Sequence, residues 1–265
     1  MLEILICIIA GLGAGVGTGF AGMSAAAVIS PMLIILLDVP AYDAIGIALA
    51  SDVLASAVSA ITYAKNKNID LKNGMVMMLC VLVFTVIGSW VSSHINDSAM
   101  GGFTLVFMLV LGVKFIVKPI QKTETAKEKK SQKALLISSV ICGVTIGFVC
   151  GFIGAGGGMM MLFVLTAILG YDLKMAVGTS VFIMSFTAFT GAVSHFAIGG
   201  IPNWIYLDVC IVSTLVFAVI SSRIANKVNH KVLNRIVGAV LLTLGVVMII
   251  FEVLKELMNI GWLSF

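Results

Sequence analysis

Long apolar runs separated by short polar breaks dominate this chain of 265 residues. The pattern consists of one Gly-rich apolar segment followed by three ordinary spans, and then the same order again. Each run is long enough to be a membrane span, because the ~30 Å hydrocarbon core needs about 17–25 apolar residues as helix. The expected Gly-rich segments are 2–37 and 134–170, and the expected ordinary spans are 44–64, 74–93, 101–117, 175–197, 204–222 and 236–254.

The two sets of four apolar segments form an internal repeat, and such a repeat decides the fold of a chain. A shift of 132 positions superimposes glycines of the first Gly-rich segment on glycines of the second. The matched pairs are Gly11 with Gly143, Gly15 with Gly147, Gly19 with Gly151 and Gly22 with Gly154, and Tyr63 falls on His195. We therefore expect a first transmembrane repeat at 1–118, a Lys-rich cytoplasmic linker at 119–132, and a second repeat at 133–265.

Composition supports a membrane protein, since 60% of the residues are hydrophobic and only 11% are charged. Soluble chains carry about 25% charged residues. This excludes a soluble enzyme, a disordered chain and a nucleic-acid binder, so the lipid bilayer is the expected surrounding. The five cysteines form no Cys-x-x-Cys pair and no cluster with metal-ligand spacing, so we expect no metal and no cofactor.

The Gly-rich segments do not fit a single straight crossing. A continuous helix of 36 residues would be about 54 Å long at 1.5 Å per residue. Each segment is therefore either one broken crossing or a pair of short helices that enter the membrane and turn back. The expected turning points are Gly19–Ser24 and Gly151–Gly158, because glycine permits the backbone conformations of a tight turn.

The distribution of Lys and Arg favours the alternative in which each Gly-rich segment enters the membrane and turns back. If each half crossed four times, the loops and tails would hold 10 basic residues inside and 5 outside. If the first segment of each half turns back, the count becomes 14 inside and 1 outside, with Lys114 set aside as a span residue. The positive-inside rule prefers the second arrangement. We therefore predict an all-α polytopic protein with two homologous halves in inverted topology, multi-pass in a prokaryotic plasma membrane, with both termini outside.

The Gly-rich breaks are candidate binding positions. A broken helix exposes backbone N–H groups that favour anions, and irregular backbone at membrane depth is tolerated only inside protein or along a cavity. A purely packing hinge is the alternative for these breaks. The first-half break has Gly22 and Ser24, and the second-half break has Gly154, Gly156, Gly157 and Gly158.

The spans that follow the breaks carry polar side chains. Asp52 and Ser56 are one helical turn apart and share a face, and Ser51 precedes them. Burying the Asp52 carboxylate in a span is costly, so it should face a cavity, have a partner or be protonated. It is either a coupling residue or a structural hydrogen-bond acceptor. In the second half, Met184 and Ala188 take the places of Asp52 and Ser56, and the candidates are Thr179, Ser180 and His195.

Three motifs of the second half resemble the TauE/SafE family of membrane permeases, known as sulfite exporters. They are Gly154–Gly158, the run Ala176-Val177-Gly178-Thr179-Ser180, and Gly191-x-x-x-His195-x-x-x-Gly199. The two-half arrangement extends the resemblance over essentially the whole chain. It implies a secondary transporter of small sulfur-containing anions such as sulfite, sulfonates or thiosulfate, usually moved outward, with the Gly-rich turns and the Gly-Thr-Ser stretch lining the site. Rocking of one half against the other would give alternating access, and a protonated Asp52 would either donate a hydrogen bond to the anion or carry a proton.

Three other functions remain as alternatives. A channel or a cation-coupled permease for another small solute needs the same spans. A purely structural membrane protein needs no site. An intramembrane serine protease would use Ser24 or Ser180 with His94 or His195, but neither serine has a Gly-x-Ser-x-Gly setting, so we expect no enzyme. A homodimer is an open alternative for assembly.

Overall fold

The computed structural model describes residues 1–92, 113, 117, 132–153, 157–199 and 202–259, some of them by their backbone alone. Every regular element of these residues is a helix, which confirms the all-α prediction. The expected span 101–117 and the linker lie almost entirely outside the described residues. The helices are α1 (Leu2–Ala21), α2 (Ala26–Leu37), α3 (Ala41–Lys65), α4 (Leu71–Ser92), α6 (Gln132–Ile153), α7 (Gly157–Phe163), the π-helix η3 (Val164–Ile168), α8 (Leu173–Gly199), α9 (Trp204–Lys227) and α10 (His230–Asn259).

Four of the described helices are long and apolar enough to cross a membrane: α1, α3, α8 and α9. Large apolar side chains stand exposed on the outside of the bundle, for example Leu79 and Val83 on α4 and Val212 and Val216 on α9. In water such a surface would drive association, whereas lipid tails are an equally apolar surrounding. The exposed apolar faces therefore fit a protein that lies within a bilayer.

The first Gly-rich segment is a long helix followed by a short helix that returns along it. Gly22 ends α1 in the left-handed region with φ 62°. α2 then runs back beside α1. Glycine has no β-carbon, and one added to Gly17 would touch the Met23 side chain, whereas one added to Gly13 would lie 3.2 Å from the Val28 side chain. The two helices are therefore in close contact. The 12 residues of α2 span only about 18 Å, too little to cross the hydrocarbon core.

The glycine stripes of the two halves pack against helices of the opposite half. A Cβ on Gly15 would lie 2.5 Å from the carbonyl oxygen of Thr214 in α9, and one on Gly147 would lie 2.6 Å from that of Val81 in α4. Only glycine lets two backbones approach so closely in lipid. The glycine stripes, Gly11, Gly15 and Gly19 on α1 and Gly143 and Gly147 on α6, therefore serve close packing of the helices.

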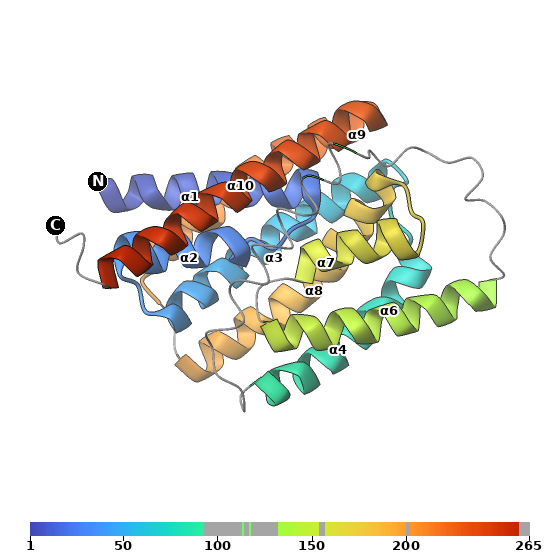
Figure 1. The fold of residues 1–265 in the computed structure, drawn as a ribbon, viewed down its shortest axis with the longest axis horizontal. Coiled ribbons are helices and arrows are strands. Elements are labelled where there is room, and N and C mark those ends of the chain that lie inside the picture. The colour runs from blue at the N-terminus through green and yellow to red at the C-terminus, as the bar shows by residue number, and fades with distance from the viewer. Residues whose placement is uncertain (93–112, 114–116, 118–131, 154–156, 200–201, 260–265) are drawn as a thin grey trace.

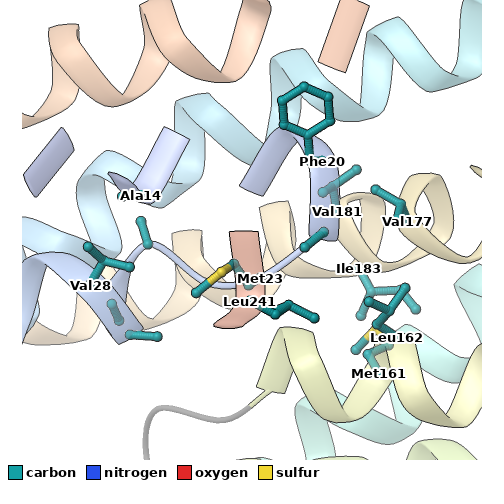
Figure 2. Packing of buried hydrophobic residues seen from close by; sticks show 14 of the residues in the cluster. Ala14, Phe20, Met23, Val28, Met161, Leu162, Val177, Val181, Ile183 and Leu241 are labelled. Atoms are coloured by element: carbon teal, nitrogen blue, oxygen red, sulfur yellow. The ribbon is translucent and has the colours of Figure 1, made fainter. Parts of the chain in front are cut away.

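The corresponding spans α3 and α8 lie antiparallel at the centre of the bundle. Gly178, near the start of α8, lies against Tyr63, near the end of α3, and Gly191 lies against Leu49. Figure 1 shows that the first residues of α1 and the last residues of α10 lie at one end of the bundle, whereas α6 begins at the opposite end. Met23, which follows α1, lies in the core among residues of α2, α7, α8 and α10 (Figure 2).

Candidate functional site

The first-half break, residues 22–25, is a fixed turn in the core. The N–H of Gly22 donates to the carbonyl of Thr18 (3.0 Å), and the N–H of Met23 donates to that of Gly17 (3.4 Å). The Thr18 hydroxyl donates to the Met23 carbonyl (2.9 Å). These bonds satisfy the backbone groups that the end of α1 leaves without helical partners. The break is therefore held rigidly at the predicted place.

Asp52 reaches this break from α3. Its side chain is 1% exposed, and its carboxylate accepts hydrogen bonds from the hydroxyls of Ser24 (2.8 Å) and Ser56 (2.7 Å). The backbone of Ala25, just before α2, is also hydrogen-bonded to it. A carboxylate at the N-terminal end of a helix interacts favourably with the helix dipole. Asp52 thus supplies a negative charge to the start of α2.

The second half contacts the same break from the other side. A Cβ on Gly158 of α7 would lie 2.5 Å from the Gly22 carbonyl oxygen and 2.9 Å from the Met23 Cα. The Ser180 hydroxyl, on α8, donates to the Val177 carbonyl (2.9 Å) and lies 3.4 Å from the Gly22 carbonyl oxygen. Residues from both predicted breaks are therefore brought together in the core.

Two predicted site residues make their hydrogen bonds elsewhere. The Thr179 hydroxyl accepts from the N–H of Asp70 (3.2 Å), at the start of α4. The Ser51 hydroxyl donates to the Ile47 carbonyl of its own helix (2.8 Å). Both side chains are buried. In this conformation neither hydroxyl is bonded to the break at 22–25, so their roles in binding stay predictions.

Part of the predicted site lies outside the described residues. Gly154 and Gly156 are in the undescribed stretch between α6 and α7, and Gly157 begins α7 with its surroundings undescribed. His195 lies in α8, but its side chain is also undescribed. Its repeat partner Tyr63 is fully buried and donates to the Gly19 carbonyl near the end of α1 (2.9 Å).

Sequence reasoning missed a polar cluster where α4 begins. The Asp70 carboxylate accepts from the Asn73 amide (2.6 Å) and the Tyr171 hydroxyl (2.7 Å). Burial alone would raise the pKa of Asp70, but these bonds favour its ionised form and bring the pKa below its ordinary value. Asp70 precedes Asn73 by three positions, which is the spacing of a helix N-cap, and this part of the cluster could have been found in the sequence. Tyr171, 101 residues away, could not have been paired with it.

Ser59 was also left out of the predicted site, although it lies on the same α3 face as Asp52 and Ser56. Its hydroxyl is fully buried and has no hydrogen-bond partner among the described residues. Buried hydroxyls are normally paired. Ser59 therefore extends the polar face of α3 by one turn beyond Ser56.

Along most of its length, this chain is similar to proteins named as membrane transporters. It is 27% identical over 264 residues to the Bacillus subtilis protein named "Probable membrane transporter protein YunE", covering 92% of this chain and 96% of the relative. It is 27% identical over 243 residues to "Probable membrane transporter protein MJ0441" of Methanocaldococcus jannaschii, covering 88% of each. No solved structure gives a significant match.

The family model described as "Sulfite exporter TauE/SafE" matches residues 7–248. The matched region includes the second Gly-rich segment, the first from residue 7 onward, Asp52 and the residues of α8 that contact the first-half break. With the apolar helices described above, this makes the protein a multi-pass membrane protein of a transporter family. The chain belongs to the sulfite exporter TauE/SafE family.

Proposed function

We propose that this chain is a secondary transporter that moves small sulfur-containing anions, such as sulfite, sulfonates or thiosulfate, outward across the membrane by alternating access. The observation that carries the proposal is the meeting of the two Gly-rich segments, where Gly158 lies against Gly22 and Met23. Broken helices that meet at the bilayer midplane are the usual substrate position in transporters with repeated halves. The substrate class itself rests on the family.

An inverted relation of the halves is part of the proposal. Its support is the antiparallel course of α3 and α8, read from Tyr63 beside Gly178 and Leu49 beside Gly191. These two helices correspond under the shift of 132. The reciprocal packing of α1 on α9 and of α6 on α4 also fits a two-fold relation. We place the end where α6 begins in the cytoplasm because of its lysines and arginines.

The anion would bind nearer the second-half break. In the first half, the start of α2 already has the Asp52 carboxylate. The residue that corresponds to Asp52 in the second half is Met184, a buried thioether that lies beside Gly158. A second negative charge is therefore disfavoured at the first break and not at the second. The backbone N–H groups of Gly156–Gly158 and the hydroxyl of Ser180 are the proposed ligands, with Thr179 and His195 as further candidates.

Asp52 would serve as the coupling residue. A carboxylate within the membrane that changes its protonation is a common carrier of proton coupling. Ser24 and Ser56 hold it beside the break, so a change of its charge would be felt where the anion binds. Export of an anion would then be linked to the pH gradient through a residue of the opposite half.

A non-enzymatic role is also part of the proposal. Ser24 donates its hydroxyl to Asp52, and Ser180 donates to a backbone carbonyl. A serine protease would need one of these hydroxyls to donate to a histidine base. Both hydroxyls instead stabilise the packing around the break.

Flux in proteoliposomes tests the proposal. Purified protein is reconstituted, and the movement of radiolabelled sulfite, a sulfonate and thiosulfate is followed with and without a pH gradient, with empty liposomes as control. We expect protein-dependent flux of at least one of these anions that responds to the gradient. Protein-dependent flux of none of them would remove the substrate class.

The topology has its own test. A single cysteine replacing Asn229, between α9 and α10, is labelled with membrane-impermeant reagents from each side of the membrane. Inverted halves put this position in the cytoplasm, so we expect labelling only in inverted vesicles. Labelling from outside intact cells would contradict the inverted arrangement.

A further inference from the structure

Helices α1 and α9, one from each repeat, are in contact at regular intervals. A Cβ on Gly11 would touch the Ser213 side chain, and one on Gly15 would lie 2.9 Å from the backbone nitrogen of Ala218. The Ser221 hydroxyl donates to the Gly15 carbonyl (2.9 Å). Residues three or four positions apart share one face of a helix. One face of each helix therefore forms this interface, and the two helices run in the same direction.

Two cysteines continue the interface toward the start of both helices. Cys7 lies one turn before Gly11 on α1, and Cys210 lies one turn before Ser213 on α9. Both cysteine side chains are fully buried. The Cys210 sulfur lies 3.9 Å from the Cys7 carbonyl oxygen, and the two thiols are hydrogen-bonded to each other. The interface thus holds one thiol of each repeat against the other.

The close approach of the two helices suits a disulfide. Such a bond needs Cα atoms about 4.4–6.8 Å apart and side chains that point toward each other. One turn from the cysteines, a Cβ on Gly11 would lie 3.0 Å from the backbone nitrogen of Thr214, so the two backbones nearly touch there. The hydrogen bond between the thiols shows that the side chains of Cys7 and Cys210 point toward each other. The pair is therefore within reach of a covalent bond.

Packing of this kind does not require a pair of thiols. The contact of α4 with α6 has the same close approach at Gly147. The shift of 132 that relates the repeats puts Ser139 in the place of Cys7 and Met78 in the place of Cys210. Single buried cysteines are ordinary core residues, but here two of them meet in one of two corresponding interfaces. Packing alone does not explain the pair.

The pair lies one turn from an end of the bundle. Glu3 is exposed and Tyr206 is partly exposed, and they precede Cys7 and Cys210 by four positions each. The side chains of Glu3 and Tyr206 are hydrogen-bonded to each other. This end is opposite to the start of α6 (Figure 1), so in the proposed topology it faces the outside. Disulfides persist in extracellular surroundings, whereas the cytosol keeps thiols reduced.

We propose that Cys7 and Cys210 form a redox site, which closes to a disulfide between the two repeats when it meets a small disulfide such as oxidised glutathione. The thiolate of one cysteine attacks the oxidant, which gives a mixed disulfide and releases one small thiolate. The second cysteine attacks the mixed disulfide and releases the other. Two cysteine thiols are oxidised, the disulfide of the oxidant is reduced, and the two cysteine protons go to the two released thiolates. The redox site does not depend on the transported substrate; only the side that the oxidant reaches rests on the proposed topology.

Crosslinking of the two repeats tests the redox site. In the full chain, Cys80, Cys142 and Cys150 are replaced by alanine, and a specific protease site is inserted in the linker 119–132. The purified protein is treated with oxidised glutathione, the remaining thiols are blocked, and the linker is cut. We expect the two repeats to run as one band on a denaturing gel and to separate after reduction. Separation without a reductant would overturn the proposal.

A shifted thiol is the matched control. Cys7→Ala combined with Ile8→Cys moves the thiol by one position to a side chain that is exposed on α1, away from the interface with α9. The crosslink should be lost in this variant. The unfolding midpoints of both reduced proteins are compared, so that loss of the fold is not mistaken for loss of the contact. An equal yield of crosslink in two folded proteins would overturn the proposal, because the bond would then form without the native interface.

Thermal unfolding shows whether the native interface accommodates the bond. The disulfide would join residues 203 positions apart, and a long closed loop removes conformational freedom from the unfolded chain. Oxidation should therefore raise the unfolding midpoint of the uncut protein and leave that of Cys7→Ala unchanged. A midpoint that stays the same or falls in the protein with both cysteines would contradict a site that is built for the bond.

The side of the membrane is tested separately. Right-side-out and inverted vesicles with the same protein are treated with oxidised glutathione, which does not cross the bilayer. We expect faster crosslinking in the right-side-out vesicles. Faster crosslinking in the inverted vesicles would contradict the proposed topology and leave the redox site standing, whereas crosslinking in neither would overturn the redox site. The proposed transport function is tested by anion flux alone and is not touched by either result.

Discussion

The two Gly-rich breaks start from the same sequence pattern but differ in charge. In the first half, Asp52 lies beside the break and accepts hydrogen bonds from Ser24 and Ser56. In the second half, the corresponding residue is Met184, whose sulfur lies beside Gly158. One repeat therefore keeps a carboxylate of its own where the other has an uncharged thioether.

This difference shows how a duplicated fold can divide two tasks. An anion that approaches the start of α2 meets the Asp52 carboxylate, and two like charges at close range in a medium of low dielectric constant repel strongly. The side chain beside Gly158 at the position corresponding to Asp52 is the uncharged thioether of Met184. Under the proposed function, the first half serves coupling and the second serves binding.

The largest expected effect comes from Gly158→Ala. The added methyl group would lie 2.5 Å from the Gly22 carbonyl oxygen and 2.9 Å from the Met23 Cα, and backbone atoms cannot move aside cheaply. We expect a loss of about 3 kcal/mol in the free energy of unfolding, or no folded protein. The measurement is the thermal unfolding midpoint in detergent together with the folded yield.

Gly13→Ala is the matched control, because its new methyl group would meet only the side-chain carbons of Val28 and Leu244, at 3.2 and 3.4 Å. Alanine also favours helix over glycine by about 1 kcal/mol. We expect near-normal stability for this variant. Equal stability of both variants would mean that the two breaks do not meet as described.

Asp52→Asn tests the division of tasks. The amide keeps the shape of the side chain but cannot carry a proton at neutral pH. With one proton coupled to each anion, a gradient of one pH unit sustains about a tenfold accumulation, and the variant should lose this response while still exchanging the anion. Asp208→Asn, at an exposed position of α9, should leave both activities unchanged. Undiminished accumulation in Asp52→Asn would assign coupling elsewhere.

Tyr63→Phe sharpens the comparison at the end of α1. The variant leaves the buried Gly19 carbonyl without its side-chain donor, and an unsatisfied buried group costs about 1–3 kcal/mol. Tyr206→Phe, at a partly exposed position, should change the free energy of unfolding by less than about 0.5 kcal/mol. Equal unfolding midpoints for the two variants would show that the bond to Gly19 contributes nothing.

The smallest expected effect is that of pH on the Asp70–Tyr171 bond. The pKa of Asp70 lies below its ordinary value, and burial beside this carboxylate raises the pKa of Tyr171 above its own. The stability that Asp70 contributes is present above pH of about 4 and is lost only as pH falls through its lowered pKa. The destabilisation by Tyr171→Phe should therefore be the same at pH 5 and pH 8. A clear difference would show that this bond titrates.

The helices could be predicted well from the sequence because each membrane span is a long run of apolar residues. The expected spans 44–64 and 175–197 became α3 and α8 with a few residues added at the ends. The place of the first break was also predictable, since Gly22 is needed for its positive φ. The bond between Asp52 and Ser56 follows from their spacing of four on one helix.

Contacts between distant segments could not be predicted in this way. Ser24 lies 28 residues from Asp52 and Tyr171 lies 101 residues from Asp70, so neither pair shares a periodic pattern. The glycine stripes indicated close packing but not the partner, because small residues fit many helices equally well. The pairing of α1 with α9 therefore required the structure.

The number of anions bound per chain tests the account most directly. Radiolabelled sulfite or thiosulfate is bound at saturating concentration to purified wild-type protein of known amount, and the bound label is counted. Because Asp52 occupies the first break, the account predicts one anion per chain. Two anions per chain would contradict the division of tasks between the breaks, and none for any sulfur-containing anion would contradict the site itself.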